Sequence, residues 1–276
     1  MSDQGQINQH YLLSDQYKDA ANLNARIRLH QRFSTNRASW HRWVFEQMNM
    51  APGSRILELG CGPGHFWKMN LDSIPEGCQI TLSDLSPGML QEAINNLGGS
   101  SQPFAFQITD AQSIPCEASS CDIVIANHML YHVPDRPRAF SEIHRILKPA
   151  GYFYATTNGK THEHEIRRLM RRAGLSFFGG MVGRSTSHFP LEDAAEQIAP
   201  WFEHIEIRRR ENALVVTEAE PLIAFMLSSL PSSAVSAEQL QLLRTIVDQE
   251  LAQDGAIHIT SDAGLVMARS RKTSAG

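Results

Sequence analysis

The stretch Ile56-Leu57-Glu58-Leu59-Gly60-Cys61-Gly62-Pro63-Gly64 decides the fold of this chain. Its apolar start predicts a buried strand, and the three glycines at alternate positions predict a tight loop directly after it. Glycine has no Cβ, so it adopts positive φ angles and lets the backbone approach a ligand closely. In an α/β sheet, this first strand-to-helix turn lies at the carboxyl edge of the strands, where nucleotide-like ligands bind. The stretch therefore predicts a ligand site.

Strand-like and helical segments alternate after this loop. Ser86 and Pro87 mark a helix start, because serine is a good cap and proline suits the first helical position. A second helix is expected at 135–147. Such alternation implies right-handed crossovers and a doubly wound, Rossmann-like α/β sheet with helices on both faces. The predicted strands of this core are 55–59, 79–83, 104–108, 122–126 and 152–157.

The flanking segments do not follow this alternation. Helical patterns before the loop predict an N-terminal helical lid, and those after the fifth strand predict a helical insertion that caps the substrate. Antiparallel C-terminal strands are expected to complete the sheet, with a capping box at Ser236 and Gln239 and a closing hairpin over 256–269. The predicted domains are 1–50 (lid), 51–160 (cofactor-binding core), 161–203 (insertion) and 204–276 (C-terminal strands and helices).

Composition excludes several classes of function. The chain has 276 residues, 42% of them hydrophobic and 20% charged, which is typical of a soluble globular protein. A formal net charge of −4 disfavours nucleic acid and anionic membranes as partners. No apolar run approaches the ~20 residues that cross a bilayer, and the first residues lack a signal-peptide pattern, so a cytoplasmic location is expected. The four cysteines form no CxxC pair, so neither a disulfide framework nor a metal site is expected.

The spacing of the glycines distinguishes between ligands. A dinucleotide-binding loop has the pattern G-x-G-x-x-G, whereas here Gly60, Gly62 and Gly64 alternate. Glu58, two residues before the first glycine, would repel a pyrophosphate but could accept hydrogen bonds from a cationic amino group. The pattern therefore disfavours a nicotinamide-dependent oxidoreductase. The alternative role for Glu58 is to bind the loop amides.

Two further acids follow the next two strands. Asp84 ends the second strand and could accept hydrogen bonds from both ribose hydroxyls, worth about 1.5–3 kcal/mol each. Its alternative role is that of a helix-capping acid, although Ser86 already supplies a cap. Asp110 follows the third strand and suits an adenine amino group, or is an ordinary turn aspartate. Three acids at the ends of consecutive strands predict a ligand with an adenosine part, a positive amino group and no phosphates.

The ordered motifs of residues 56–64, 82–89, 109–111, 122–132 and 145–151 resemble those of class I S-adenosylmethionine-dependent methyltransferases. Residues 26–30 and 211–225 resemble a group of bacterial small-molecule methyltransferases; Ala150 stands where this pattern usually has glycine. The resemblance implies S-adenosyl-L-methionine as cofactor. Arg26 is the candidate for its carboxylate, with Arg28 and Arg32 as competitors and a solvated basic helix face as the alternative. The cofactor-binding residues that it implies are Arg26, Glu58, Gly60, Cys61, Gly62, Asp84, Leu85, Met89, Asp110, Ala111, Asn127 and His128.

Methyl transfer from a sulfonium requires few catalytic groups from the protein. The sulfonium is already a strong electrophile, so the protein must align a nucleophile with the S–CH₃ bond and exclude water. A thiolate, neutral amine or enolate needs no base, whereas a phenol or hydroxyl needs a proton acceptor such as histidine. His128, His132 and His162 are the candidate catalytic residues, with a structural hydrogen bond as the alternative for His132. The run His162-Glu163-His164 is interpreted as a solvated helix start and not as a metal site.

The sequence thus predicts methyl transfer to an O, N, S or C atom of a small, partly apolar or aromatic metabolite. The alternative is a non-catalytic S-adenosylmethionine-binding protein with a regulatory or accessory role. Several large apolar residues could line the substrate pocket or equally form the core. They are Tyr11, Tyr17, Trp40 and Trp43 near the N-terminus and Phe177, Phe178, Met181 and Phe189 in the insertion. The acceptor atom and the oligomeric state stay open.

Overall fold

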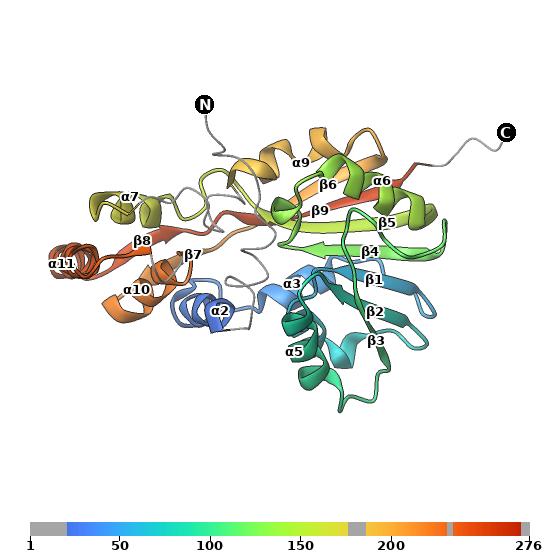
Figure 1. Ribbon diagram of the computed structural model, residues 1–276, viewed down its shortest axis with the longest axis horizontal. Helices are drawn as coiled ribbons and strands as arrows, with labels where there is room; N and C mark the ends of the chain where they lie inside the picture. The colour runs from blue at the N-terminus through green and yellow to red at the C-terminus, as the bar shows by residue number, and fades with distance from the viewer. Residues whose placement is uncertain (1–20, 176–185, 231–233, 272–276) are drawn as a thin grey trace.

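The computed structural model describes residues 21–175, 186–230 and 234–271, and its centre is a seven-stranded sheet (Figure 1). The strand order is β3-β2-β1-β4-β5-β9-β6, with the first five strands parallel and β9 antiparallel to both of its neighbours. The predicted Rossmann-like sheet with antiparallel C-terminal strands is confirmed. The strands are β1 (Arg55–Leu59), β2 (Gln79–Asp84), β3 (Phe104–Ile108), β4 (Cys121–Asn127), β5 (Leu147–Asn158), β6 (Phe202–Arg210) and β9 (Ala263–Ser270).

Helices cover both faces of this sheet, because neighbouring residues of a buried strand point in opposite directions. Leu57 packs in one hydrophobic cluster and Ile56 in another on the opposite face. The Leu57 face is covered by α6 (Arg136–Ile146) and α9 (Leu191–Ile198). The Ile56 face is covered by α3 (Trp40–Glu46), α4 (His65–Lys68) and α5 (Pro87–Leu97). Short 3₁₀ helices lie at η2 (Leu71–Ser73) and η3 (Leu130–His132).

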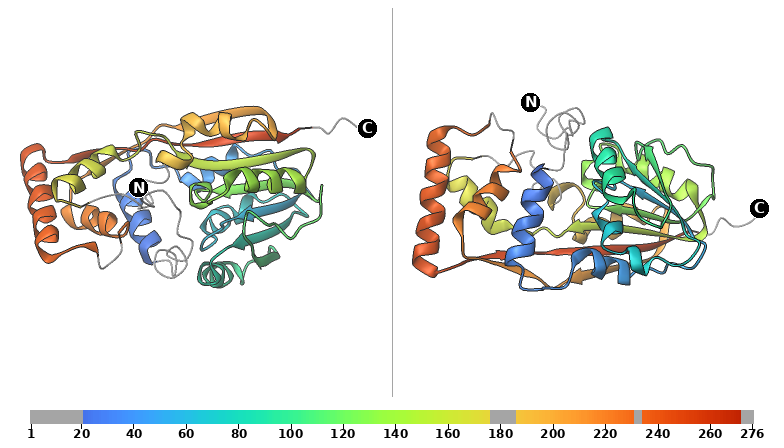
Figure 2. Two further views of the ribbon diagram at one scale, coloured as in Figure 1. Left: turned by 45° about the horizontal axis from the view of Figure 1, so that its top comes forward. Right: turned by 90° about the horizontal axis from the view of Figure 1, so that it is seen from below.

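A second hydrophobic core lies beside the sheet and joins segments from both ends of the chain. Leu29, Leu222 and Leu243 are fully buried in it and come from three different helices. Figures 1 and 2 show α7, α10 and α11 gathered at one end of the molecule, with α5 toward the other. The elements of this core are α2 (Ala21–Phe33), α7 (His164–Arg172), α10 (Ala219–Leu227), α11 (Ala237–Asp254) and the antiparallel pair β7 (Ala213–Val216) and β8 (Ile257–Thr260).

The predicted hairpin over 256–269 is wrong. β8 pairs with β7 in the small sheet, whereas β9 pairs with β5 and β6 in the large one. The two strands serve different cores, because Ile259 of β8 is buried in the second core and Val266 of β9 in the sheet core. Asp262, in the connection between them, binds Thr161 and Arg209. The connection therefore links two sheets and does not close one.

The predicted capping box of α11 is confirmed, with reciprocal hydrogen bonds between Ser236 and Gln239. A Ser236→Ala variant should lose about 1 kcal/mol of the free energy of unfolding, because the amide of Gln239 then lacks its acceptor. Urea unfolding followed by circular dichroism measures this loss. Ser236→Asp keeps an N-cap acceptor and should stay within a few tenths of a kcal/mol of the parent protein. Equal losses in both variants would contradict the assignment.

No helix in residues 21–175, 186–230 and 234–271 is both long and apolar enough to span a bilayer.

Candidate active site

A cavity of about 610 Å³ lies at the carboxyl ends of β1, β2 and β4 and is closed on its other side by α2, α3 and the turn after β5. The structure brings all of the predicted site residues together in its lining. They are Arg26, Glu58, Gly60, Cys61, Gly62, Asp84, Leu85, Met89, Asp110, Ala111, Asn127, His128, His132 and His162. Their individual roles stay predictions.

The glycine loop has the backbone that its sequence predicts. Gly60, Gly62 and Gly64 have φ angles of 66°, 53° and 75°, which side chains with a Cβ adopt at a cost. A Cβ on Gly60 would also lie 2.7 Å from the Cβ of Met129. Both the conformation and the close approach of the 128–132 segment therefore require glycine at the first position.

Glu58 is 1% exposed and is bound by side chains. Its two carboxylate oxygens accept hydrogen bonds from Nε1 of Trp67 at 2.6 Å and from Nδ2 of Asn127 at 2.9 Å. Burial is the main cause that raises the pKa of Glu58 to about 7; the nearby Asp84 raises it further, and the two hydrogen bonds oppose the rise. The carboxyl group of Glu58 lines the cavity and titrates near neutral pH. A cationic ligand beside it would favour its charged form.

Asp84 binds the glycine loop from the end of β2. Its carboxylate accepts hydrogen bonds from the amide of Gly62 at 2.9 Å and from that of Ser86 at 2.8 Å. Ser86, and not Asp84, caps α5, since its hydroxyl accepts from the amide of Met89. Burial raises the pKa of Asp84, and these backbone hydrogen bonds oppose the rise. A carboxylate oxygen has more than one acceptor site, so each can still accept from a ligand.

Asp110 closes a tight turn after β3. Its carboxylate accepts hydrogen bonds from the backbone amide and the side-chain amide of Gln112. Next to it, Ala111 and Met89 are almost fully buried and supply an apolar surface to the cavity. The Asp110 carboxylate and this apolar surface together suit a flat ring system with polar atoms at its edge.

His128 follows β4 in a strained conformation. Its φ is 49°, and its amide donates to the carbonyl and the hydroxyl oxygen of Thr156. The ring lies 5.4 Å from that of Trp40. Burial, then the neighbouring histidines, lower the pKa of His128 to about 3, so the ring is neutral near pH 7. His132 is half-buried, with its ring 4.5 Å from that of Tyr131.

The turn between β5 and α7 differs from its prediction as a solvated helix start. His164 is exposed, but His162 and Glu163 are 5% and 1% exposed and line the cavity. Glu163 Oε1 lies 3.2 Å from Nε2 of His162 and 3.3 Å from Nε2 of His30 on α2. Sequence reasoning missed His30 and Glu163 as site residues. The one available signal was that Arg26 and His30, four residues apart, share a helix face.

Arginines line the same side of the cavity. Arg26 is buried and donates to the hydroxyl and the carbonyl oxygen of Ser228. Of its two competitors, Arg28 is exposed and Arg32 is bound to Glu218 at the surface. Arg210, which sequence reasoning missed, lies over the Trp40 ring at 5.8 Å and donates to the carbonyl of Ala38.

The large apolar residues divide between cavity and core. Trp40 lines the cavity, whereas Trp43 packs against the core beneath α3. Phe189 is fully buried against Phe140 in the sheet core. Within the described part of the chain, no three His, Cys, Asp or Glu side chains are grouped to hold a metal ion. Tyr11, Tyr17, Phe177, Phe178 and Met181 lie outside the described residues.

Sequence and structure comparisons agree with this geometry. Residues 57–155 match the methyltransferase domain family. A demethylmenaquinone methyltransferase of Symbiobacterium thermophilum is 28% identical over 130 residues, which are 46% of this chain and 52% of that protein. A ubiquinone biosynthesis O-methyltransferase of Xanthomonas oryzae pv. oryzae is 25% identical over 167 residues, 60% of this chain and 67% of that protein. The match thus spans half to two thirds of the length of these relatives.

Among solved structures, the phosphoethanolamine N-methyltransferase 2 of Haemonchus contortus, in complex with S-adenosyl-L-methionine, has a TM-score of 0.60 at 18% identity. The comparison covers 95% of this chain and 60% of that one, and it shows a shared fold. The matched domain agrees with the glycine loop and with the acids at successive strand ends. These findings support a class I S-adenosylmethionine-dependent methyltransferase domain over residues 57–155.

Proposed function

We propose that this protein transfers the methyl group of S-adenosylmethionine to a small, partly apolar or aromatic metabolite. The observation that carries this proposal is the convergence of Glu58, Asp84 and Asp110 on one cavity, beside a glycine loop. On this proposal, Glu58 receives the ammonium group, Asp84 the ribose hydroxyls, and Asp110 with Ala111 the adenine edge. When bound, the cofactor supplies an electrophilic methyl group.

The far half of the cavity is proposed to hold the acceptor. It is lined by the rings of Trp40 and Phe225 and by the polar groups of His30, His162 and Glu163. Such a lining, apolar with a few buried polar groups, is typical of sites for small organic molecules. The two relatives, a demethylmenaquinone methyltransferase and a ubiquinone biosynthesis O-methyltransferase, support an acceptor with an aromatic ring.

The chain's own contribution to the reaction is then position, exclusion of water and proton transfer. The half-buried His128, neutral near pH 7, lies next to Asn127, which binds Glu58, so it would border the cofactor. The packing of Trp40 over His128 would keep water away from the reacting atoms. A hydroxyl acceptor would need a base from among His128, His132 and His162.

Calorimetry with S-adenosylmethionine tests the proposal. The protein should bind it, and Asp84→Ala should weaken binding by about 100-fold or more, because two charge-assisted hydrogen bonds of about 1.5–3 kcal/mol each are lost. Asp84→Asn, which keeps one acceptor for the loop amides, should also bind weakly. Asp72→Ala is the control, since the Asp72 side chain is 78% exposed, does not line the cavity and pairs only with Arg42 among the described residues. Binding that is absent, or unchanged in both Asp84 variants, would overturn the proposal.

A further inference from the structure

A buried arginine without an acidic partner lies in the half of the cavity that is proposed to hold the acceptor. Arg210, the last residue of β6, is only 9% exposed and lines the cavity. The two residues before it, Arg208 and Arg209, pair with acids at the surface. Burial lowers the pKa of Arg210, and no acidic group opposes this shift. Arginine is rarely buried to this extent unless its charge is paired, so a ligand is the partner to look for.

The protein satisfies only a part of the Arg210 guanidinium. Nη2 donates to the carbonyl oxygen of Ala38, and the group lies over the ring of Trp40 at 5.8 Å. Nε is enclosed and has no hydrogen-bond partner within residues 21–175, 186–230 and 234–271. Nη1 makes no hydrogen bond in this part of the chain either, but it is not enclosed. A ligand in the cavity can therefore reach the guanidinium through Nη1.

Two serine hydroxyls line the same half of the cavity. Ser34 follows α2, and Ser261 lies between β8 and β9. Both hydroxyls accept hydrogen bonds from Nδ2 of Asn212, at 3.4 and 3.1 Å. Asn212 is fixed in this orientation, because its Oδ1 accepts from the backbone amide of Asn36 at 3.0 Å. Neither hydroxyl makes another hydrogen bond among the described residues, so the hydrogen of each is left for a ligand.

The strand pairing brings these groups to one wall. Arg210 is paired with Ala263 across β6 and β9, and both residues line the cavity. Ser261 precedes Ala263 by two residues, so it lies beside the end of β6. Ser34 forms an antiparallel bridge with Leu214 in β7, the strand that follows Arg210 in the sequence. The guanidinium and the two hydroxyls are therefore close to one another.

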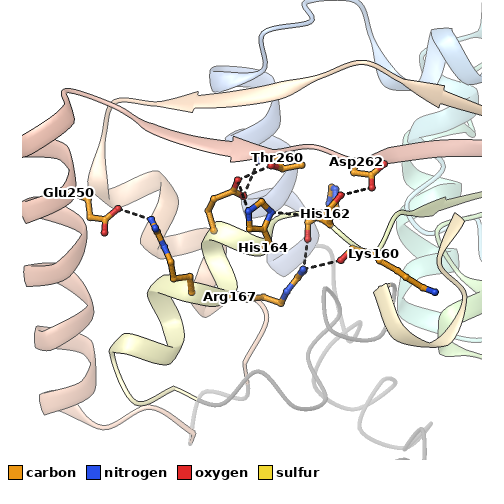
Figure 3. A network of polar contacts seen from close by, with 10 residues as sticks. Lys160, His162, His164, Arg167, Glu250, Thr260 and Asp262 are labelled. Atoms are coloured by element: carbon orange, nitrogen blue, oxygen red, sulfur yellow. Dashed lines mark hydrogen bonds and ion pairs between the residues drawn. The ribbon is translucent and has the colours of Figure 1, made fainter. Parts of the chain in front are cut away.

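The connection that carries Ser261 is held in place by its neighbours. Asp262, the next residue, lies beside the turn before α7 (Figure 3). The Thr161 hydroxyl donates to its carboxylate at 2.8 Å, and the amide of Gly159 donates to its backbone carbonyl. A Cβ on Gly159 would lie 1.9 Å from this carboxylate, so the turn and the connection are in close contact. Ser261 is thus fixed by the fold and needs no ligand to order it.

The chemistry of these groups suits a carboxylate. They offer hydrogen-bond donors and one positive charge, and a carboxylate brings acceptors and one negative charge. A neutral group would leave the charge of Arg210 unbalanced, and a dianion such as a phosphate would add a second negative charge to a wall that already holds Glu163. The Glu163 carboxylate is bound by His162 and His30, so it does not serve as the partner of Arg210.

We propose that Arg210, Ser34 and Ser261 bind a carboxylate of the methyl acceptor. This inference rests on the proposed function and adds to it the acceptor class: an organic acid with an aromatic or apolar body. The Trp40 ring contacts both Arg210, at 5.8 Å, and His128, at 5.4 Å. With its carboxylate at Arg210, the acid lies with its body along Trp40 and its other end toward His128, where the cofactor is proposed to bind.

Paired acids and amides test this proposal without turnover. Benzoate, phenylacetate and 3-phenylpropanoate, each beside its uncharged amide, are titrated by calorimetry into the full chain saturated with S-adenosylhomocysteine at neutral pH. The three acids differ in length, so they cover different distances between the carboxylate and the cofactor. At least one acid should bind about 10- to 100-fold more tightly than its amide, because its carboxylate makes a charge-assisted hydrogen bond with the guanidinium.

Variants of two arginines on β6 assign this preference to its cause. Arg210→Met should abolish the preference for the acid and change the affinity for the amide little, because methionine keeps an apolar chain against Trp40. Arg210→Lys keeps the charge and should retain a part of the preference. Arg208→Met is the matched control, since Arg208 does not line the cavity, and it should keep the whole preference. A structural role of Arg210 alone would weaken binding of acid and amide equally.

The outcomes separate this inference from the proposed function. Acids that fail to bind, or that bind no more tightly than their amides, would overturn the carboxylate subsite, and so would a preference that Arg210→Met retains. Tighter binding of phenyl phosphate than of all three acids would overturn the carboxylate as the ligand class. Failure to bind S-adenosylhomocysteine would instead contradict the proposed function. Should Arg210→Met not fold, Ser261→Ala decides: it should lower the preference about tenfold, and an unchanged preference would overturn the inference.

Discussion

Substitution of Gly60 by alanine is expected to weaken binding of S-adenosylmethionine by about 100-fold or more. The φ of 66° costs a residue with a Cβ roughly 1–2 kcal/mol, and the 2.7 Å approach to Met129 adds an overlap that typically costs 1–3 kcal/mol. The loop can relieve the unfavourable φ and the overlap with Met129 only by moving away from the position that the ligand needs. Since 1.4 kcal/mol corresponds to a factor of ten in affinity, about 3 kcal/mol gives the expected loss.

Gly53→Ala is the matched control for this variant. Gly53 precedes the same strand, has a φ of 74°, and an added Cβ there would meet nothing within 4 Å. It should therefore lose stability, as measured by urea unfolding, yet bind S-adenosylmethionine in calorimetry as the parent protein does. Parent-like affinity in Gly60→Ala would contradict the close packing of the loop against the 128–132 segment. Equal losses of affinity in both variants would show that a positive φ alone explains the effect.

Glu58→Gln is expected to stabilise the protein without ligand at pH 8 and to weaken its binding of the cofactor. The pKa of Glu58 rises on folding from 4.5 to about 7, so the charged form is disfavoured in the folded protein. The stability that comes with the protonated form is complete below pH 4.5 and is lost as the pH rises through 7. The whole difference corresponds to roughly 3 kcal/mol, and a neutral glutamine should recover about 1–3 kcal/mol of it.

Thermal unfolding at two pH values measures the first effect. At pH 8 the Tm of Glu58→Gln should exceed that of the parent protein by about 2–8 °C, whereas at pH 4.5 the two should agree. Calorimetry measures the second effect: parent affinity for S-adenosylmethionine should fall below pH 7, and the variant should be weak throughout. Glu46→Gln, on an exposed residue of α3, should change neither quantity. A Tm lowered equally at both pH values would contradict the assigned cause.

The cofactor half of the cavity could be predicted because its determinants are local. Glu58 and Asp84 lie at the carboxyl ends of β1 and β2, Asp110 follows β3, and each of these strands is recognisable by itself. The carboxyl ends of parallel strands meet at one edge of the sheet. Recognising the strands was therefore enough to predict that the three acids lie close together. The same holds for the caps at Ser86 and Ser236, which depend on residues three positions away.

The other half could not be predicted, because its contacts join distant segments. His30 and Glu163 are 133 positions apart in sequence, and their meeting depends on the positive φ of Glu163, which no propensity indicates. The hairpin error has a similar origin. Ile259 of β8 and Val266 of β9 lie on either side of a turn-like sequence. The two strands join different sheets because the two residues pack in different hydrophobic cores.

The two hydrophobic cores also have a consequence for how this protein can change over evolutionary time. The family match covers residues 57–155, whereas the opposing wall of the cavity comes from α2, α3, α10 and the turn that begins at Asn158. The second core supports α2 and α10. Substitutions at sites far apart are nearly additive in free energy, so those in the second core should leave the glycine loop largely undisturbed. If the second core carries acceptor preference, recombination or engineering of that core would exchange the acceptor while the methyl donor stays the same.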